Sequence, residues 1–244
     1  ARYPLLVYSI MNAPRICIHW FRRDLRLHDN HGLFRALAEH GDVLPIFIFD
    51  THILARLDTI RDRRVDFIHR TLQALQERLV EAGSSLHVEH GEPLAVWQKL
   101  LDTYDISAVT TNGDHEPYAK QRDERVAALL KSKGIPFRTF KDTTLFGYDE
   151  ILKDDGMPYT VYTPYARKWH SSFNVEMEVP FPSEMHFHRL WKTKPLPVPS
   201  LKSIGFERTD LVALPLVLSE ETLRHYHQNR DFPAVDGTSR MSSH

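Results

Sequence analysis

Three clusters of polar residues follow short apolar runs in this sequence of 244 residues, at positions 22–24, 50–51 and 112–116. The first cluster reads Arg-Arg-Asp and belongs to the stretch "WFRRDLRLHDN" (20–30). Arginines pair with carboxylates or bind anions, and carboxylates accept hydrogen bonds from N–H and hydroxyl groups. The clusters therefore favour either a ligand-binding edge or an ion-pair network that braces loops.

Other residues that could bind a ligand or a metal, or react, lack the partners that such a site requires. The sequence holds neither G-x-G-x-x-G after its first apolar run nor a Walker loop. The histidine pairs His87/His90 and His186/His188 have no supporting ligand set, so we expect surface histidines and no metal site. Cys17 lies among apolar residues, which raise the pKa of a thiol and block access to it, so we expect it to be inert.

The polar clusters must be positioned by elements that alternate along the chain. The predicted strands are 16–21, 43–50, 85–91, 106–112 and 137–142. The predicted helices are 31–41, 61–83, 92–105 and 116–134. Strands that alternate with helices imply right-handed crossovers and a parallel sheet covered on both faces. The predicted fold is therefore a doubly wound, five-stranded, Rossmann-like α/β domain, in which ligands bind beyond the carboxyl ends of the strands.

The ends of the predicted helices carry their own signals. Asp29 or Asn30 is expected to cap the first helix, and Gly41 to end it. Gly83 should end the second helix, and Pro93 should lie in the first turn of the third.

Composition excludes several classes of protein. The chain has 31 Lys and Arg against 32 Asp and Glu, a formal net charge of −1, so nothing indicates a bulk attraction to nucleic acid. The single cysteine permits no intrachain disulfide and fits a cytoplasmic protein. No apolar run approaches the roughly 18–20 residues that span a bilayer, so no membrane is expected among the partners.

The chain is expected to have four parts. Residues 1–14 read as an N-terminal extension, with Met11 as one candidate start, and 15–143 as the α/β domain. Residues 144–218 read as a connector and interdomain linker, whose proline-rich part (191–205) has few apolar residues to bury and should lie along a surface. Residues 219–244 read as the start of a helical domain, with acidic residues in the first helical turn.

Four motifs in order resemble the DNA photolyase and cryptochrome family. They are "CIHWFRRDLRLHDNHGLFRAL" (17–37), "DHEPYAKQRD" (114–123), "PYTVYTPYARKW" (158–169) and "YHQNRDFPAVDGTSRMSSH" (226–244). The resemblance implies an N-terminal α/β domain that holds an antenna pigment and supports a helical domain carrying FAD and a DNA-lesion pocket.

The implied activity is that of a deoxyribodipyrimidine photolyase, the light-driven splitting of cyclobutane pyrimidine dimers in UV-damaged DNA. The alternative is a cryptochrome-type blue-light receptor without repair activity, and a free-standing nucleotide-binding domain is disfavoured. The family's lesion-contacting helices and its relay tryptophans match nothing in these 244 residues, so no catalytic residue is assigned. The 244-residue chain alone is expected to be an inactive monomer that reaches DNA through the helical domain.

The resemblance also implies residues that hold FAD. Tyr226 matches the family's tyrosine at the edge of the flavin. The family's segment that wraps around the FAD phosphates matches Thr238, Ser239, Arg240, Met241 and Ser242. Hydroxyl and backbone N–H groups in a turn suit a pyrophosphate.

The antenna pigment can be a folate or a deazaflavin or flavin in this family. The folate type has an Asn-Glu pair where this chain has Tyr118 and Ala119. The deazaflavin type shows Asp-x-Glu-Pro-Tyr, which 114–118 reproduce, although Asp114 and Glu116 would also suit a helix cap. A deazaflavin or FMN is therefore favoured over methenyl-folate, and a pocket that holds no pigment is the remaining alternative.

The residues expected to line the pigment pocket are Arg23, Phe49, Asp50, Asp114 and Glu116. For Arg22, as for Arg23, contact with the pigment and a purely structural role are both left open. Asp24 and Arg26 are expected to be mainly structural.

Overall fold

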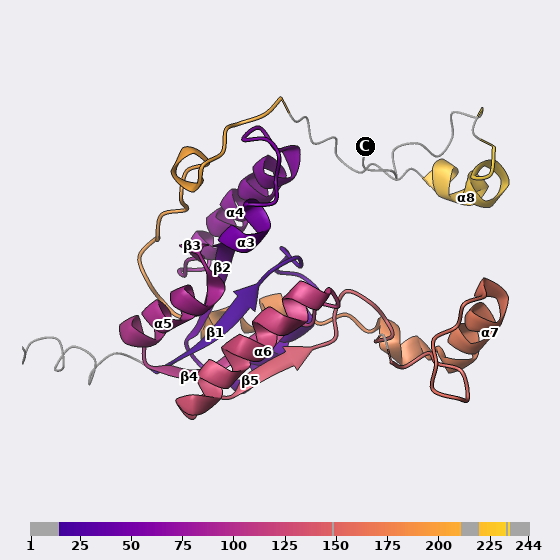
Figure 1. Cartoon of the computed structure of the whole chain (residues 1–244), viewed down its shortest axis with the longest axis horizontal. Helices are drawn as coiled ribbons and strands as arrows, with labels where there is room; N and C mark the ends of the chain where they lie inside the picture. Colours follow the sequence, from indigo (N-terminus) through magenta and orange to yellow (C-terminus); the bar gives the residue numbers. More distant parts are fainter. Residues whose placement is uncertain (1–14, 148, 211–219, 233, 235–244) are drawn as a thin grey trace, which may run out of the picture. The chain divides into compact units, whose positions relative to one another are not determined.

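The computed structural model describes residues 15–147, 149–210, 220–232 and 234. The chain divides into two compact units, Ala1–Arg208 and Thr209–His244. The sheet belongs to the first unit (Figure 1). The domain boundaries expected from the sequence, at 143 and 218, stay predictions.

The described residues form a sheet of five parallel strands in the order β3-β2-β1-β4-β5. The strands are β1 Ile16–Phe21, β2 Val43–Asp50, β3 His87–Gly91, β4 Ile106–Asn112 and β5 Phe137–Phe140. The chain winds outward from β1 to β3 and then crosses back to β4 on the other side of β1. This order confirms the predicted doubly wound fold and places its switch point between β1 and β4, where ligands bind in such sheets.

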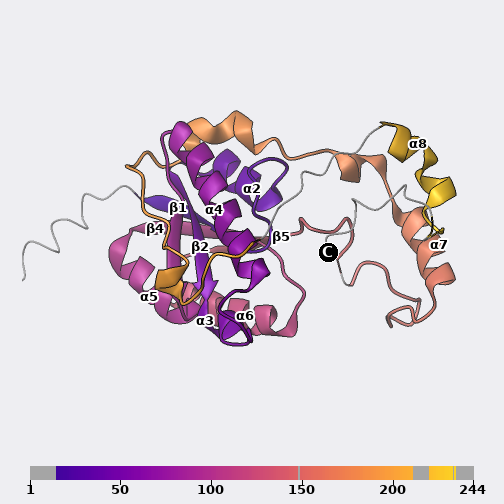
Figure 2. The same ribbon diagram turned by 90° about the horizontal axis from the view of Figure 1, so that it is seen from above.

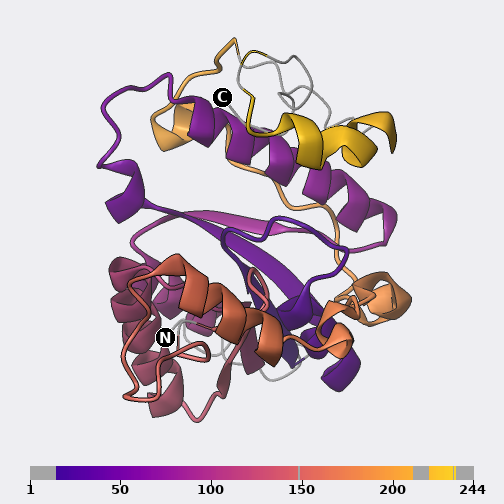
Figure 3. The same ribbon diagram turned by 90° about the vertical axis from the view of Figure 1, so that its right-hand side faces the viewer.

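Helices cover both faces of the sheet. They are α2 His31–Glu39, α3 Thr51–Leu54, α4 Arg63–Glu81, α5 Pro93–Thr103 and α6 Pro117–Ser132. Helices α2 and α4 pack on one face, and α5 and α6 pack on the other (Figures 2 and 3).

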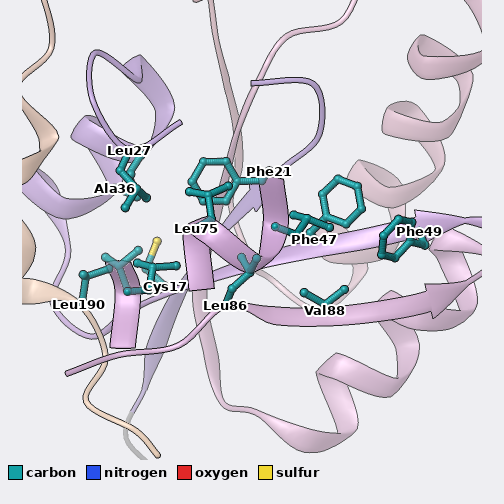
Figure 4. Close-up of a cluster of buried hydrophobic side chains, with 14 of the residues drawn as sticks. Cys17, Phe21, Leu27, Ala36, Phe47, Phe49, Leu75, Leu86, Val88 and Leu190 are labelled. Atoms are coloured by element: carbon teal, nitrogen blue, oxygen red, sulfur yellow. The ribbon is translucent and has the colours of Figure 1, made fainter. Parts of the chain in front are cut away.

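Alternate residues of β1 enter two separate cores. Cys17 and Phe21 belong to the core under α2 and α4 (Figure 4), whereas Ile18 and Trp20 belong to the core under α5 and α6. Full burial of a side chain such as Phe21 or Ile18 stabilises the fold by about 1.5–3 kcal/mol. Burial raises the pKa of the Cys17 thiol to about 12, which agrees with the expected inert cysteine.

The helix ends match the sequence signals with one exception. Gly83 ends α4 with a positive φ of 77°, and Pro93 is the first residue of α5, as predicted. The prediction that Gly41 ends helix α2 was wrong. This helix ends at Glu39, and its C-cap residue, His40, already has an extended backbone conformation. The left-handed conformation near this end is taken by Asp42, with φ of 52°.

The connector holds more structure than the sequence indicates. It contains α7 Tyr162–Ser172 and three 3-10 helices: η1 Val175–Glu178, η2 Ser183–Arg189 and η3 Lys202–Ile204. The part expected to lie along a surface runs beside α4, where Gln76 donates to the carbonyl of Leu196 at 2.5 Å. It also buries Leu201 and Ile204 in the core, so its role is structural as well as connecting.

The second unit is described through one helix, α8 Glu220–Asn229, whose first turn holds the two acidic residues expected there. Among the described residues, none of the helices has the length and apolar character that a bilayer crossing requires.

Candidate functional site

A cleft of about 430 Å³ opens at the carboxyl ends of β1 and β2. It is lined by all five residues that the sequence nominated for a pigment: Arg23, Phe49, Asp50, Asp114 and Glu116. Arg23 follows β1, Phe49 and Asp50 end β2, and the two acidic residues lie in the turn between β4 and α6. The fold thus brings together residues that are up to 93 positions apart. Their role in binding a pigment stays a prediction.

One wall of the cleft is apolar. Its β2 part is formed by Phe47, Ile48 and Phe49, and the short helix α3 adds Ile53 and Leu54. The rings of Phe47 and Phe49 meet edge to face with centroids 5.0 Å apart. Helix α3 was not predicted from the sequence, although Asp50, an N-cap residue directly before Thr51, was a signal for it.

Asp50 is held by hydrogen bonds on both carboxylate oxygens. Oδ1 accepts from the backbone N–H of His52 at 2.9 Å, and Oδ2 accepts from the hydroxyl of Tyr118 at 2.7 Å. Burial of the phenol and its hydrogen bond to Asp50 raise the pKa of Tyr118, so the hydroxyl stays protonated. The side chain of Asp50 is 5% exposed, which leaves a fixed acceptor at the edge of the cleft.

Arg23 joins the two carboxylates of the turn. Its Nη1 lies 2.8 Å from Oε1 of Glu116 and 3.5 Å from Oδ1 of Asp114. The side chains of Arg23 and Glu116 are each 63% exposed, whereas that of Asp114 is 10% exposed. Burial opposes the ionisation of Asp114, but the backbone N–H of Glu116 and the guanidinium of Arg23 outweigh it and lower its pKa.

The alternative helix-cap reading holds only for the backbone. Glu116 is the N-cap residue of α6 and Pro117 is the first helical residue, while the carboxylate of Glu116 is directed to Arg23. Asp114 accepts from the backbone N–H of Glu116 at 3.2 Å. Neither carboxylate caps α6, so Arg23 and the turn before the helix hold these two side chains.

Trp20 and Arg122 also line the cleft, and neither was predicted from the sequence. The Arg122 guanidinium lies 4.9 Å from the centroid of the indole, and that of Arg22 lies 5.3 Å from it. Both arginines pair with Asp123, and Nη1 of Arg122 lies 3.9 Å from Oδ2 of Asp50. Tyr118 and Arg122 are four residues apart on α6 and so share one helix face, a spacing that could have identified them.

Asp24 belongs to a buried hydrogen-bond network rather than to the cleft's lining. Asn30 and Asn112 both donate to its Oδ2, the former at 3.0 Å. Oδ1 of Asn30 accepts from the backbone of Leu33 at 3.0 Å, so Asn30 is the cap of α2. Arg26 reaches the carboxylate of Asp142 at 2.9 Å. These contacts agree with a structural role for the Asp24 side chain.

The residues expected to hold FAD divide into two groups. Tyr226 is half-buried on α8, with the Arg230 guanidinium 5.8 Å from its ring centroid. Thr238, Ser239, Arg240, Met241 and Ser242 lie outside the described residues. The FAD site therefore stays a prediction.

Comparisons with known proteins agree with this architecture. The sequence profile of the family described as DNA photolyase matches residues 17–184. A deoxyribodipyrimidine photo-lyase of Synechococcus sp. (strain ATCC 27144 / PCC 6301 / SAUG 1402/1) is 34% identical over 248 residues, which cover 95% of this chain and 50% of the relative. The chain thus spans about half the length of this curated relative.

Two solved structures are similar to this one. An archaeal photolyase from Sulfolobus tokodaii with two FAD molecules is 34% identical, with a TM-score of 0.50 over 54% of this chain and 30% of that chain. A class III photolyase from Agrobacterium tumefaciens, 22% identical, shares the fold with a TM-score of 0.67 over 88% of this chain and 41% of that chain. Because the family profile covers more than half of the sequence and the sheet has the fold of these structures, the chain belongs to the DNA photolyase family.

Proposed function

We propose that this chain serves the light-driven repair of cyclobutane pyrimidine dimers in DNA, and that its α/β unit holds a flavin or deazaflavin antenna pigment. FAD is the redox cofactor in this proposal, and UV-damaged DNA is the substrate. The observation that carries the antenna role is the convergence of Arg23, Phe49, Asp50, Asp114 and Glu116 on one cleft. Family membership and a relative named as a photolyase support the repair role.

The chemistry of the cleft fits a planar tricycle with a polar edge. The apolar wall around Phe49 offers a ring contact worth about 0.5–1.5 kcal/mol beyond burial. Asp50 and Asp114 offer carboxylate oxygens to ring N–H and ribityl hydroxyl groups. A bound pigment would supply light absorption and pass its excitation energy to FAD. The similar Sulfolobus photolyase, which is described with two FAD molecules and a novel light-harvesting cofactor, also favours a flavin.

The cleft offers less to a folate. Where the folate type has its Asn-Glu pair, the Tyr118 hydroxyl already donates to Asp50, and Ala119 is a buried residue without a polar side chain. A folate would therefore lose the amide and carboxylate contacts of that pair.

The test of the antenna role is a titration of the whole chain with FMN, a deazaflavin and a methenyl-folate, followed by absorbance and fluorescence. An Asp114→Ala/Glu116→Ala variant should bind either tricycle more weakly by about 1–3 kcal/mol per lost partner. The matched control is Glu77→Ala/Glu81→Ala, which removes two exposed charges from α4 and should leave affinity unchanged. Tight folate binding that ignores the first double substitution would overturn the assignment.

The repair role is tested in the source cell. Deleting the coding sequence of this chain should abolish the recovery that visible light gives after UV irradiation, with dimers counted in the DNA. Unchanged dimer removal combined with a lost response to blue light would support the cryptochrome alternative. In vitro, these 244 residues with reduced FAD should split dimers no faster than free reduced FAD does.

A further inference from the structure

We propose that Tyr118 is a positioning residue of the antenna cleft, which fixes the carboxylate of Asp50 so that it accepts a hydrogen bond from the pigment. This proposal rests on the proposed antenna function and names a residue that acts on the ligand through Asp50. The observation behind it is the 2.7 Å hydrogen bond from the Tyr118 hydroxyl to Oδ2 of Asp50.

Two hydrogen bonds fix the carboxylate plane of Asp50, whereas Nη1 of Arg122, 3.9 Å from Oδ2, adds charge attraction without a hydrogen bond. Oδ1 is held by the N–H of His52 at the start of α3, and Oδ2 by Tyr118 on α6. A carboxylate oxygen has lone pairs for more than one donor, so each oxygen can still accept from a ligand. Without Tyr118, the contact to His52 would be the remaining hydrogen bond on this carboxylate, and the group could rotate about its Cβ–Cγ bond.

Tyr118 is itself held in place by its surroundings. Guanidinium groups of Arg56 and Arg122 lie 5.4 Å and 5.9 Å from its ring centroid, and the ring of His52 lies 6.0 Å away. Cation–π contacts of this kind contribute to the orientation of an aromatic ring. The oriented phenol of Tyr118 thus connects α6 to the end of β2 through its hydrogen bond to Asp50.

The arrangement selects the group on the ligand that faces Asp50. A carboxylate that already accepts two hydrogen bonds can offer a ligand only further acceptor sites, so the facing group must be a donor. The imide N–H of a flavin-like ring or a ribityl hydroxyl meets this requirement. A ligand carboxylate or carbonyl at the same place would leave two acceptors opposed, which is unfavourable in a buried site.

A double-mutant cycle tests this role in the whole chain, with FMN as the probe and its fluorescence as the readout. The variants are Tyr118→Phe, Asp50→Ser and the two combined. Serine keeps an N-cap oxygen for α3 but lacks the carboxylate. Tyr118→Phe alone should weaken FMN binding about 5- to 10-fold, because FMN then has to order the Asp50 carboxylate that the phenol no longer holds. In the Asp50→Ser background the same substitution should change affinity less than about 2-fold, because coupled residues are not additive.

The matched control is Tyr104→Phe. It removes a hydroxyl that is also hydrogen-bonded, to His87 at 3.0 Å, but lies between α5 and β3, outside the cleft. This variant should bind FMN as the native chain does, and the urea unfolding midpoints of all variants show whether each is folded.

The outcomes separate the two proposals. A native chain that binds FMN, with equal effects of Tyr118→Phe in both backgrounds or with no effect in either, overturns the positioning role and leaves the antenna function intact. A native chain that binds neither FMN nor a deazaflavin overturns the antenna function and the positioning role together.

Discussion

The backbone N–H of Gly32 donates a 2.8 Å hydrogen bond to Oδ1 of Asn112, which lies 80 residues later. Gly32 is in the first turn of α2, and Asn112 is the last residue of β4. A Cβ atom built at Gly32 would lie 2.6 Å from that same oxygen and 3.2 Å from the backbone carbon of Thr111. The start of α2 can approach the switch point this closely only because residue 32 has no side chain.

Gly32→Ala should therefore lower the free energy of unfolding by about 1–3 kcal/mol, the usual effect of overpacking a buried position. Urea unfolding followed by tryptophan fluorescence measures it, since Trp20 and Trp97 are buried. The control is Gly41→Ala, where no described heavy atom lies within 4 Å of the added Cβ. That variant should be neutral or stabilising by up to about 1 kcal/mol, and equal losses in both would contradict the explanation.

Asp24→Ala should lower the free energy of unfolding by about 2–4 kcal/mol, because each unsatisfied buried donor costs about 1–3 kcal/mol. The substitution removes the common acceptor of Asn30 and Asn112. Asp154→Ala, at an exposed position of the connector, is the control and should change stability by less than about 0.5 kcal/mol. A near-neutral Asp24→Ala would show that the network can rearrange around the lost carboxylate.

His19 should make the fold sensitive to mild acid. Burial lowers the pKa of this histidine to about 4 from 6.5, with Nδ1 2.9 Å from Oγ1 of Thr110. Between these values the unfolded chain binds a proton that the folded chain excludes, so stability is complete above pH 6.5 and falls as the pH falls toward 4. The loss between pH 7 and pH 5 should be about 2 kcal/mol.

The control for this effect is His19→Gln, which keeps a polar side chain and removes the titration. Urea unfolding of both proteins at pH 7 and pH 5 isolates the contribution of His19, because the carboxylates with lowered pKa values, such as Asp62 and Asp114, titrate mainly below this window. An identical pH dependence in the two proteins would contradict the prediction.

The 244-residue chain should bind DNA weakly. Its 31 basic and 32 acidic residues leave little net charge to release counterions. Fluorescence anisotropy with intact and dimer-containing oligonucleotides should give similar dissociation constants, within or above the roughly 1–100 µM range of non-specific binding. Tight binding that prefers the lesion would place a DNA-contacting surface on this chain.

The sequence could predict the elements whose residues are buried with a clear period. β1 and α4 are examples, because Ile18, Trp20, Leu72 and Leu79 repeat at strand and helix spacings. Helix α7 was not predicted from the sequence, because it buries none of its residues and therefore has no apolar face that a periodic pattern could indicate.

The same distinction holds for the cleft. Asp114 and Glu116 were identified because motif and strand end coincide. The hydrogen bond between Tyr118 and Asp50 joins residues 68 positions apart, so it depends on where the start of α6 lies relative to the end of β2. The four-residue spacing of Tyr118 and Arg122 indicates that they share one face of α6. The sequence does not indicate that this face meets Asp50.

The position of β1 in the sheet has a consequence for synthesis on the ribosome. β1 pairs with β2 on one side and with β4 on the other, and its six residues, ICIHWF, are all buried in the finished fold. A nascent chain that has not yet exposed β4 therefore carries β1 as an apolar edge strand, the kind of surface that invites aggregation and chaperone binding. The strand is covered once β4, which ends at Asn112, has left the ribosome, and the cleft beside it is complete only after Arg122 has followed.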